Sequence, residues 1–88
     1  MVRVYVLIET RSEKTGEVVE ALKSVDQVVS ADAVTGPYDA IAIVECETLQ
    51  KLGECIISKV QTIRGISRTV SCIAVPISKI SQTQDALR

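Results

Sequence analysis

Residues 2–9 alternate between two sets of side chains, which is the pattern of a β-strand. β-Branched residues fill one set, so the two sets are expected to face opposite sides of a sheet. The first set is Val2, Val4, Val6 and Ile8, and the second is Arg3, Tyr5, Leu7 and Glu9. The sequence therefore predicts a strand at the start of the chain.

Residues 17–24 change to the spacing of an α-helix. Apolar side chains recur three or four positions apart, which places them in one stripe along the helix. These side chains are Val18, Ala21, Leu22 and Val25. We expect Ser12 or Thr15 to cap this helix and Asp26-Gln27 to end it.

Two more strands are predicted in the middle of the chain, joined by a turn at Gly36-Pro37. Residues 27–35 carry polar members, which suits an edge strand. One face of this strand is expected to hold Val29, Ala31 and Ala33. Residues 39–45 are apolar at nearly every position, which is typical of a central strand covered on both faces. Gly36 accepts backbone angles that other residues resist, and Pro37 presets φ for a turn.

A second helix and a fourth strand are predicted next. The helical stripe is Leu49, Leu52, Ile56, Val60 and Ile63. Thr48 is the expected N-cap, and Arg64-Gly65 is expected to end the helix. Gly53 costs about 1 kcal/mol relative to Ala inside a helix, so we expect a close packing contact there. Residues 66–75 form the last predicted strand, and Pro76 suits a strand's end or a sheet edge.

The order of elements repeats in the two halves of the chain. Two interleaved βαβ units make the ferredoxin-like βαββαβ sandwich, an α+β fold with four antiparallel strands and both helices on one face. We predict this fold for residues 1–77, in the manner of dimeric α+β barrels, followed by a polar tail at residues 78–88.

Helices on one face leave the other face of the sheet uncovered. The expected helix side holds Val4, Val6, Ala40, Ala42, Val44, Val70 and Cys72. The expected open side holds Tyr5, Leu7, Ile41, Ile43, Ile73 and Val75. Burying each such side chain is worth about 1.5–3 kcal/mol. We therefore predict a two-fold homodimer in which the open faces pack against each other, with these six residues in the interface.

The composition limits the size of the core and the class of partner. The chain has 88 residues, 47% of them hydrophobic, and its aromatic residues are two Tyr. One domain with an aliphatic core is expected, and the apolar excess indicates an oligomer. The net charge is −1 and there is no basic cluster, so direct nucleic-acid binding is not expected. With no leader pattern and no run of roughly 18 apolar residues, we expect a soluble cytoplasmic protein without a membrane span.

Catalytic and metal-binding chemistry has little support in the sequence. Cys46, Cys55 and Cys72 form no CxxC motif, and the chain has no His. A zinc site or a Cys-His pair is therefore not expected, and the cysteines are interpreted as small reduced core residues. Gly16 and Gly53 form no phosphate loop. We expect no enzyme activity, no metal and no cofactor.

The turn and the last strand hold the candidate ligand-binding residues. Backbone N–H groups near Gly36 can hold a carboxylate, and Asp39 can hold an ammonium group, which together would suit an amino acid. The alternative is an ordinary hairpin with Tyr38 and Asp39 facing solvent. Thr69 and Ser71 alternate on one side of the last strand, where their hydroxyls are either satisfied locally or contact a ligand.

Three segments together resemble the C-terminal effector domain, or RAM domain, of the Lrp/AsnC family of transcription regulators. They are Val4-Tyr5-Val6-Leu7-Ile8, Val34-Thr35-Gly36-Pro37-Tyr38-Asp39, and Ile63-Arg64-Gly65-Ile66 with Thr69 and Ser71. The resemblance covers roughly residues 2–75. It implies a ferredoxin-like fold, dimerisation through the sheets and assembly of dimers into rings.

In the family, small effectors, usually amino acids, bind between dimers near the turn. Carried over by position, the implied ligand-binding residues are Gly36, Pro37, Tyr38, Asp39, Thr69 and Ser71. Gly36 and Pro37 would offer backbone, Asp39 would hold an amino group or fix the turn, and the two hydroxyls would contact polar ligand atoms.

This chain differs from full-length family members because it starts at the first strand, without a helix-turn-helix domain. We therefore expect a stand-alone effector module that senses an amino acid by itself or co-assembles with full-length regulators and modulates transcription indirectly. Two alternatives stay open: a structural oligomerisation module that binds no ligand, and a small dimeric α+β-barrel enzyme.

Overall fold

Strand β1 (Val2–Thr10) lies inside a four-stranded antiparallel sheet with the order β2-β3-β1-β4. The computed structural model describes residues 1–77. The other strands are β2 (Val28–Ala33), β3 (Ala40–Cys46) and β4 (Ile66–Ile73). The strand predicted at residues 27–35 is the edge strand β2, and the strand predicted at residues 39–45 is the central strand β3. The helices cover only one face of β3, so the prediction that both of its faces are covered does not hold within the described chain. The predicted tail at residues 78–88 lies outside the described residues.

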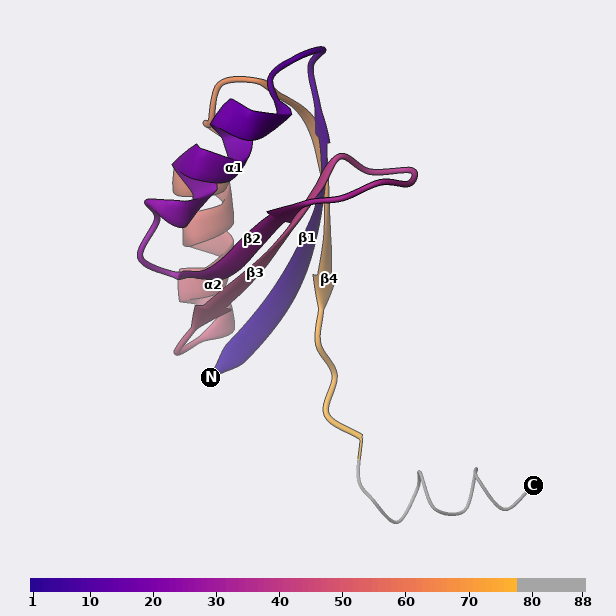
Figure 1. Ribbon diagram of the computed structural model, residues 1–88. Helices are drawn as coiled ribbons and strands as arrows, with labels where there is room; N and C mark the ends of the chain where they lie inside the picture. Colours follow the sequence, from indigo (N-terminus) through magenta and orange to yellow (C-terminus); the bar gives the residue numbers. More distant parts are fainter. Residues whose placement is uncertain (78–88) are drawn as a thin grey trace, which may run out of the picture.

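Both helical elements cover the same face of the sheet, as Figure 1 shows. Helix α1 is Thr15–Lys23, and helix α2 is Leu49–Cys55. Helix α2 continues into a π-helical turn, η1 (Ile56–Val60), where the Gln61 amide donates to the Ile56 carbonyl over 2.8 Å. The predicted βαββαβ order and the ferredoxin-like sandwich are therefore confirmed.

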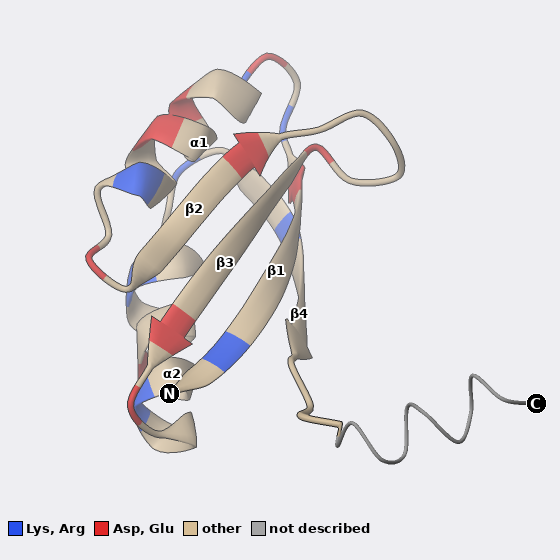
Figure 2. Cartoon of the chain, turned by 60° about the horizontal axis from the view of Figure 1, so that its bottom comes forward, with Lys and Arg blue, Asp and Glu red and all other residues tan. Residues whose placement is uncertain are grey.

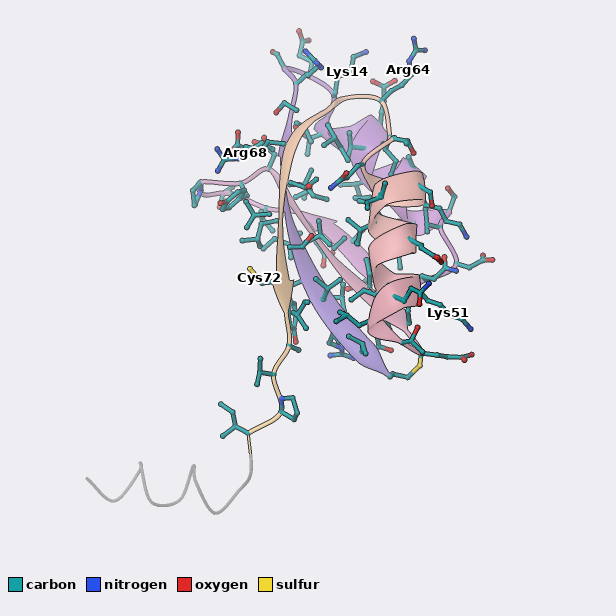
Figure 3. The ribbon with its side chains drawn as sticks, turned by 180° about the vertical axis from the view of Figure 1, so that it is seen from behind. Lys14, Lys51, Arg64, Arg68 and Cys72 are labelled. Carbon is teal, nitrogen blue, oxygen red and sulfur yellow. The ribbon has the colours of Figure 1, made fainter. Side chains whose placement is uncertain are left out.

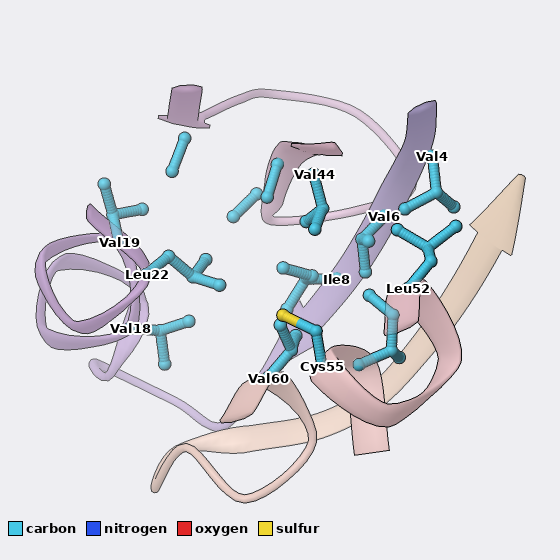
Figure 4. Close-up of a cluster of buried hydrophobic side chains, with 14 of the residues drawn as sticks. Val4, Val6, Ile8, Val18, Val19, Leu22, Val44, Leu52, Cys55 and Val60 are labelled. Atoms are coloured by element: carbon cyan, nitrogen blue, oxygen red, sulfur yellow. The ribbon is translucent and has the colours of Figure 1, made fainter. Parts of the chain in front are cut away.

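The core lies between the sheet and the two helices (Figure 4). Alternate residues of the central strands point into it, because successive side chains of a strand face opposite sides. From the sheet these are Val4, Val6, Ile8, Ala40, Ala42 and Val44, all at most 1% exposed. Val18, Leu22, Leu52 and Val60 meet them from the helices. The first strand therefore packs against both helical elements.

The predicted assignment of β4 side chains to the two faces of the sheet was inverted. Directly paired residues of antiparallel strands point to the same side, and β4 pairs Val70 with Leu7, Cys72 with Tyr5, and Ile73 with Val4. Val70 and Cys72 thus belong to the open face, and Cys72 points away from the helices in Figure 3.

Ile73 lies on the helix side, and Val75 lies beyond the end of β4. The error arose because β4 has apolar residues on both of its faces near its end, so the sequence pattern does not indicate which face is toward the helices. The open face of the described chain is therefore formed by Tyr5, Leu7, Ile41, Ile43, Val70 and Cys72.

Several local predictions also need correction. Neither Ser12 nor Thr15 caps α1, whose N-cap Lys14 makes no side-chain capping bond, because the Thr15 hydroxyl instead pairs with that of Thr10 at 2.7 Å. Thr48 does cap α2, accepting from the Lys51 amide over 3.1 Å. Leu49, predicted in the stripe, is 58% exposed.

Edge strand β2 and Gly53 differ from expectation as well. The β2–β3 register shifts between Val28 and Ser30, so Val29 turns to solvent and is 55% exposed, while Ala31 stays buried. A Cβ added at Gly53 would meet no heavy atom within 4 Å, so the close packing contact predicted at this glycine is absent. Within residues 1–77, no helix has the length and apolar character needed to span a membrane.

The turn between η1 and β4 depends on Gly65. Its φ is +98°, and an added Cβ would lie 2.9 Å from Lys14 Cβ and 3.0 Å from Val18 Cγ2. We predict that Gly65→Ala lowers the free energy of unfolding by about 1–3 kcal/mol. Gly53→Ala, in a helix with open space around it, should raise it by up to about 1 kcal/mol. Urea unfolding of both variants tests this, and a similar change in both would contradict it.

Candidate functional site

The loop between β2 and β3, here called the hinge loop (residues 34–39), projects beyond the sheet on the side away from the helices (Figure 1). The Val34 amide donates to the Asp39 carbonyl over 2.9 Å, which closes the base of the loop. Gly36 has a φ of +137°, a conformation that favours glycine. Gly36 and Pro37 are exposed at the tip, whereas Tyr38 is half-buried.

Asp39 ties the hinge loop to the end of β1. One of its carboxylate oxygens, Oδ2, accepts from the Thr10 amide over 2.8 Å, and its own amide donates to the Ile8 carbonyl over 2.8 Å. The structure thus supports the role of Asp39 in fixing the turn. A carboxylate has further acceptor capacity, so this role and contact with a ligand are compatible.

Thr69 and Ser71 lie on β4, opposite Ile8 and Val6 respectively. Both residues therefore face the helix side of the sheet, Thr69 half-buried and Ser71 exposed. The hinge loop projects to the other side, and β1 lies between β3 and β4. Within one chain the structure does not bring the two hydroxyls and the hinge loop to one site.

Two prominent clefts in the described part of the chain are lined by other residues. The larger, about 800 Å³, is lined by Arg11, Lys14, Glu17, Ala21, Ile63, Arg64, Gly65 and Ile66. The smaller, about 430 Å³, includes Cys46, Glu47, Lys51 and Cys55 in its lining. The larger cleft was not predicted, because the basic residues that line it come from two separate parts of the sequence. The Arg64-Gly65 turn is the sequence feature that points to a loop at this position.

The cysteines differ in their surroundings. Cys46 and Cys55 are buried, as predicted, but Cys72 is exposed on the open face. Burial, followed by the neighbouring Cys46, raises the pKa of the Cys55 thiol, which disfavours its reactive thiolate. Within residues 1–77, no cluster of three or more His, Cys, Asp or Glu side chains is arranged to hold a metal ion.

The open face has an apolar centre with an ion pair toward each end of β1, and Figure 2 shows the charged segments of β1 and β3 near the ends of these strands. Arg3 pairs with Glu45 across β1 and β3, and Arg68 pairs with Glu9 across β4 and β1 at 3.7 Å. Hydrogen bonding to Tyr5 and then to Glu45 raises the pKa of Arg3. An apolar centre with a polar rim is the usual anatomy of a protein interface.

Comparison with known proteins shows the family of the chain. The sequence model described as the Lrp/AsnC ligand binding domain matches residues 3–84. The chain belongs to the Lrp/AsnC ligand binding domain family. It is therefore a regulatory ligand-binding module, and its resemblance to the effector domain of this family is confirmed.

Several solved structures share its fold. A hypothetical protein from Pyrococcus horikoshii is 35% identical, with 88% of this chain and 93% of the other covered and a TM-score of 0.81. AsnC from E. coli is 30% identical, with 89% of this chain but 54% of AsnC covered and a TM-score of 0.79. No curated protein sequence matches the chain.

A third structure is more distant. The transcriptional regulator NMB0573 from Neisseria meningitidis, solved as a complex with L-Met, is 14% identical, with 89% of this chain and 52% of the regulator covered and a TM-score of 0.77. At this identity the likeness establishes the shared Lrp/AsnC fold alone.

The hydrogen bond from Thr10 to Asp39 gives a direct test of the hinge loop. We predict that Asp39→Ala, without any ligand, lowers the free energy of unfolding by about 1.5–3 kcal/mol, because a half-buried amide loses a charged acceptor. Asp26→Ala, at an exposed aspartate in another turn, should change it by less than about 0.5 kcal/mol. Urea unfolding measures both, and equal losses would show that Asp39 does not hold the turn.

Proposed function

We propose that this Lrp/AsnC domain binds a small effector, an amino acid, at a site between dimers, and acts on transcription indirectly through Lrp/AsnC-type regulators. The observation that carries the proposal is the match to the family's ligand binding domain over residues 3–84. The geometry of the hinge loop and of β4 then indicates how the site is assembled.

The candidate ligand-binding residues favour a site built from more than one copy of the chain. The hinge loop projects on the open side of the sheet, whereas Thr69 and Ser71 face the helix side. A small ligand that touches both sets must therefore lie between chains. This arrangement would make binding depend on assembly, which is a means of regulation.

An amino acid suits the chemistry of the hinge loop. Exposed backbone N–H groups near Gly36 can donate to a carboxylate, and Asp39 retains a carboxylate oxygen for an ammonium group. The regulator from N. meningitidis, which shares this fold, was solved with L-Met. The backbone groups of the hinge loop recognise the part that all amino acids share, so side-chain specificity depends on the neighbouring copy.

Dimerisation through the open face supplies the first step of assembly. Its half-buried centre includes Leu7, Ile41 and Ile43, and Tyr5 is 37% exposed. The two ion pairs at its ends are cross-strand pairs that leave this apolar centre free of charge. A second copy packed on this face by a two-fold axis would remove the same side chains from water on both chains.

The structure also favours one alternative function. The Asp39 carboxylate is already engaged by Thr10, and neither cleft is formed by the hinge loop. A module that only assembles and binds no effector would show the same features. Assembly and effector binding therefore need separate tests.

For assembly, we predict that Ile43→Asp halves the mass of the smallest species in solution, because burying an unpaired carboxylate costs several kcal/mol. Ile57→Asp, which places the same substitution at a residue 65% exposed on η1, should leave the mass unchanged. Light scattering measures the mass of both variants.

Cys72 provides a second readout, because its thiol should react with an aromatic disulfide reagent faster in Ile43→Asp than in the native protein. A monomeric native chain would contradict the proposed dimer.

For effector binding, we predict that one or a few of the twenty amino acids raise the melting temperature of the assembled protein, because a ligand that binds only the folded state stabilises it. Ser71→Ala should weaken that binding roughly three- to tenfold, the effect expected for one lost hydrogen bond.

The matched control is Ser67→Ala, in the same strand, where the hydroxyl donates to the Glu9 carbonyl over 3.1 Å. The Ser67→Ala variant should bind the amino acid with unchanged affinity in calorimetric titration. If no amino acid shifts the melting temperature of an assembled protein, the oligomerisation module is the better description.

A further inference from the structure

The larger cleft lies on the helix side, at the end of the sheet where β1 leads into α1 and where β4 begins. Arg11 and Lys14 come from the β1–α1 loop, and Arg64 comes from the turn before β4. Figure 3 shows Lys14 and Arg64 at this same end of the molecule, remote from Lys51. The hinge loop does not contribute to the cleft.

A close backbone contact brings these distant basic residues together. The Arg11 amide donates to the Gly65 carbonyl over 2.7 Å. Gly65 can approach this closely because it has no Cβ, which would otherwise lie 2.9 Å from Lys14 Cβ. The two loops are therefore held side by side, and the cleft does not depend on a flexible segment to form.

Arg11 and Arg64 differ from the other basic residues of the described chain. Arg3, Lys14, Lys23, Lys51 and Arg68 each pair with a Glu, and Lys59 contacts the Gln27 amide. Within residues 1–77, Arg11 and Arg64 are the two arginines without an acidic partner, and both line this cleft. Neither guanidinium charge is therefore neutralised by a side chain of the described residues, which leaves both available to an anion.

The charge of the cleft can be counted. Its lining holds three cations and one acid, Glu17, which pairs with Lys14 at 3.1 Å. Three positive charges and one negative charge leave a net charge of +2. The first turn of α1 also borders the cleft, and no side chain caps its N–H groups. These amides add partial positive charge on the same side.

We propose that this cleft is a second ligand site, which binds a small molecule carrying two negative charges at one end and an apolar portion at the other. Arg11 and Arg64 hold the anionic end, since guanidinium groups bind phosphate and carboxylate oxygens in a bidentate manner. Ala21, Ile63 and Ile66 form the wall for the apolar portion. The volume of about 800 Å³ is within the range of small-molecule sites.

Two ligand classes share this chemistry, a phosphate monoester and an alkyl-substituted dicarboxylate with both carboxylates on one carbon. A nucleotide is less suited, because the lining contains no aromatic side chain on which a base could stack. The proposal concerns residues outside the hinge loop and β4 hydroxyls, so it is independent of amino-acid binding.

The test is calorimetric titration of the full chain with phenyl phosphate and with n-butylmalonate, each at constant ionic strength adjusted with sodium chloride. We expect saturable binding of at least one. Binding of phenyl phosphate alone assigns the phosphate class, and binding of n-butylmalonate alone assigns the dicarboxylate class. Absence of saturable binding by both overturns the proposal.

Variants locate the site. Arg11→Ala and Arg64→Ala should each weaken binding roughly tenfold or more, the effect of losing a charged hydrogen-bond donor. Lys51→Ala removes the same charge at the remote end and should leave the affinity unchanged. Both arginines are exposed, so circular dichroism should show an intact fold in each variant. Equal weakening in all three variants would indicate nonspecific attraction and overturn the site. In NMR spectra of the native protein, the ligand should shift the Arg11 and Gly65 amides first.

Discussion

The structure depends on a sheet that is apolar on both faces while its helices cover only one. Val4, Val6 and Ile8 of β1 are buried beneath the helical elements, yet Tyr5 and Leu7 of the same strand face the open side. Two helical elements that both pack on one side leave the second face without cover. An apolar face of this kind is typical of a surface that contacts another protein, which is why the proposed function begins with assembly.

The end of β1 links the two regions with ligand-binding chemistry. The Thr10 amide bonds to Asp39 of the hinge loop, and the next amide, that of Arg11, bonds to Gly65 at the edge of the basic cleft. The hinge loop projects on the open side and the cleft lies on the helix side, so two successive amides hold both from opposite directions. Hydrogen bonds from backbone amides cost more to break when they are partly buried, so these two bonds fix the positions of both loops more firmly than contacts between exposed side chains would.

Similarity to known structures separates what is general in this fold from what is particular to the chain. A TM-score of 0.77 at 14% identity shows that the fold tolerates nearly complete replacement of its side chains. The layer arrangement needs only apolar alternation in the strands and an apolar stripe on the helices. Other features depend on individual residues: the hinge loop has a positive φ at Gly36, the close approach of the Gly65 turn to Lys14 requires the absence of a Cβ, and the charge of the basic cleft depends on Arg11 and Arg64.

The order of the elements, their two layers, and which strands lie at the centre or edge of the sheet could all be predicted from the sequence, because the spacing of apolar residues indicates which side of an element is buried. The sequence also identified Thr48 as a cap and placed Asp39 in a structured turn, since both depend on local chemistry. The side chains of β4 that share the face of Tyr5 could be identified only from the three-dimensional structure. Near its end β4 has apolar residues on both faces, so its hydrogen-bond register with β1 determines which of them lie beside Tyr5. The same holds for the basic cleft: Arg11 and Arg64 are remote in sequence, and it is the absence of a Cβ at Gly65 that lets their two loops meet.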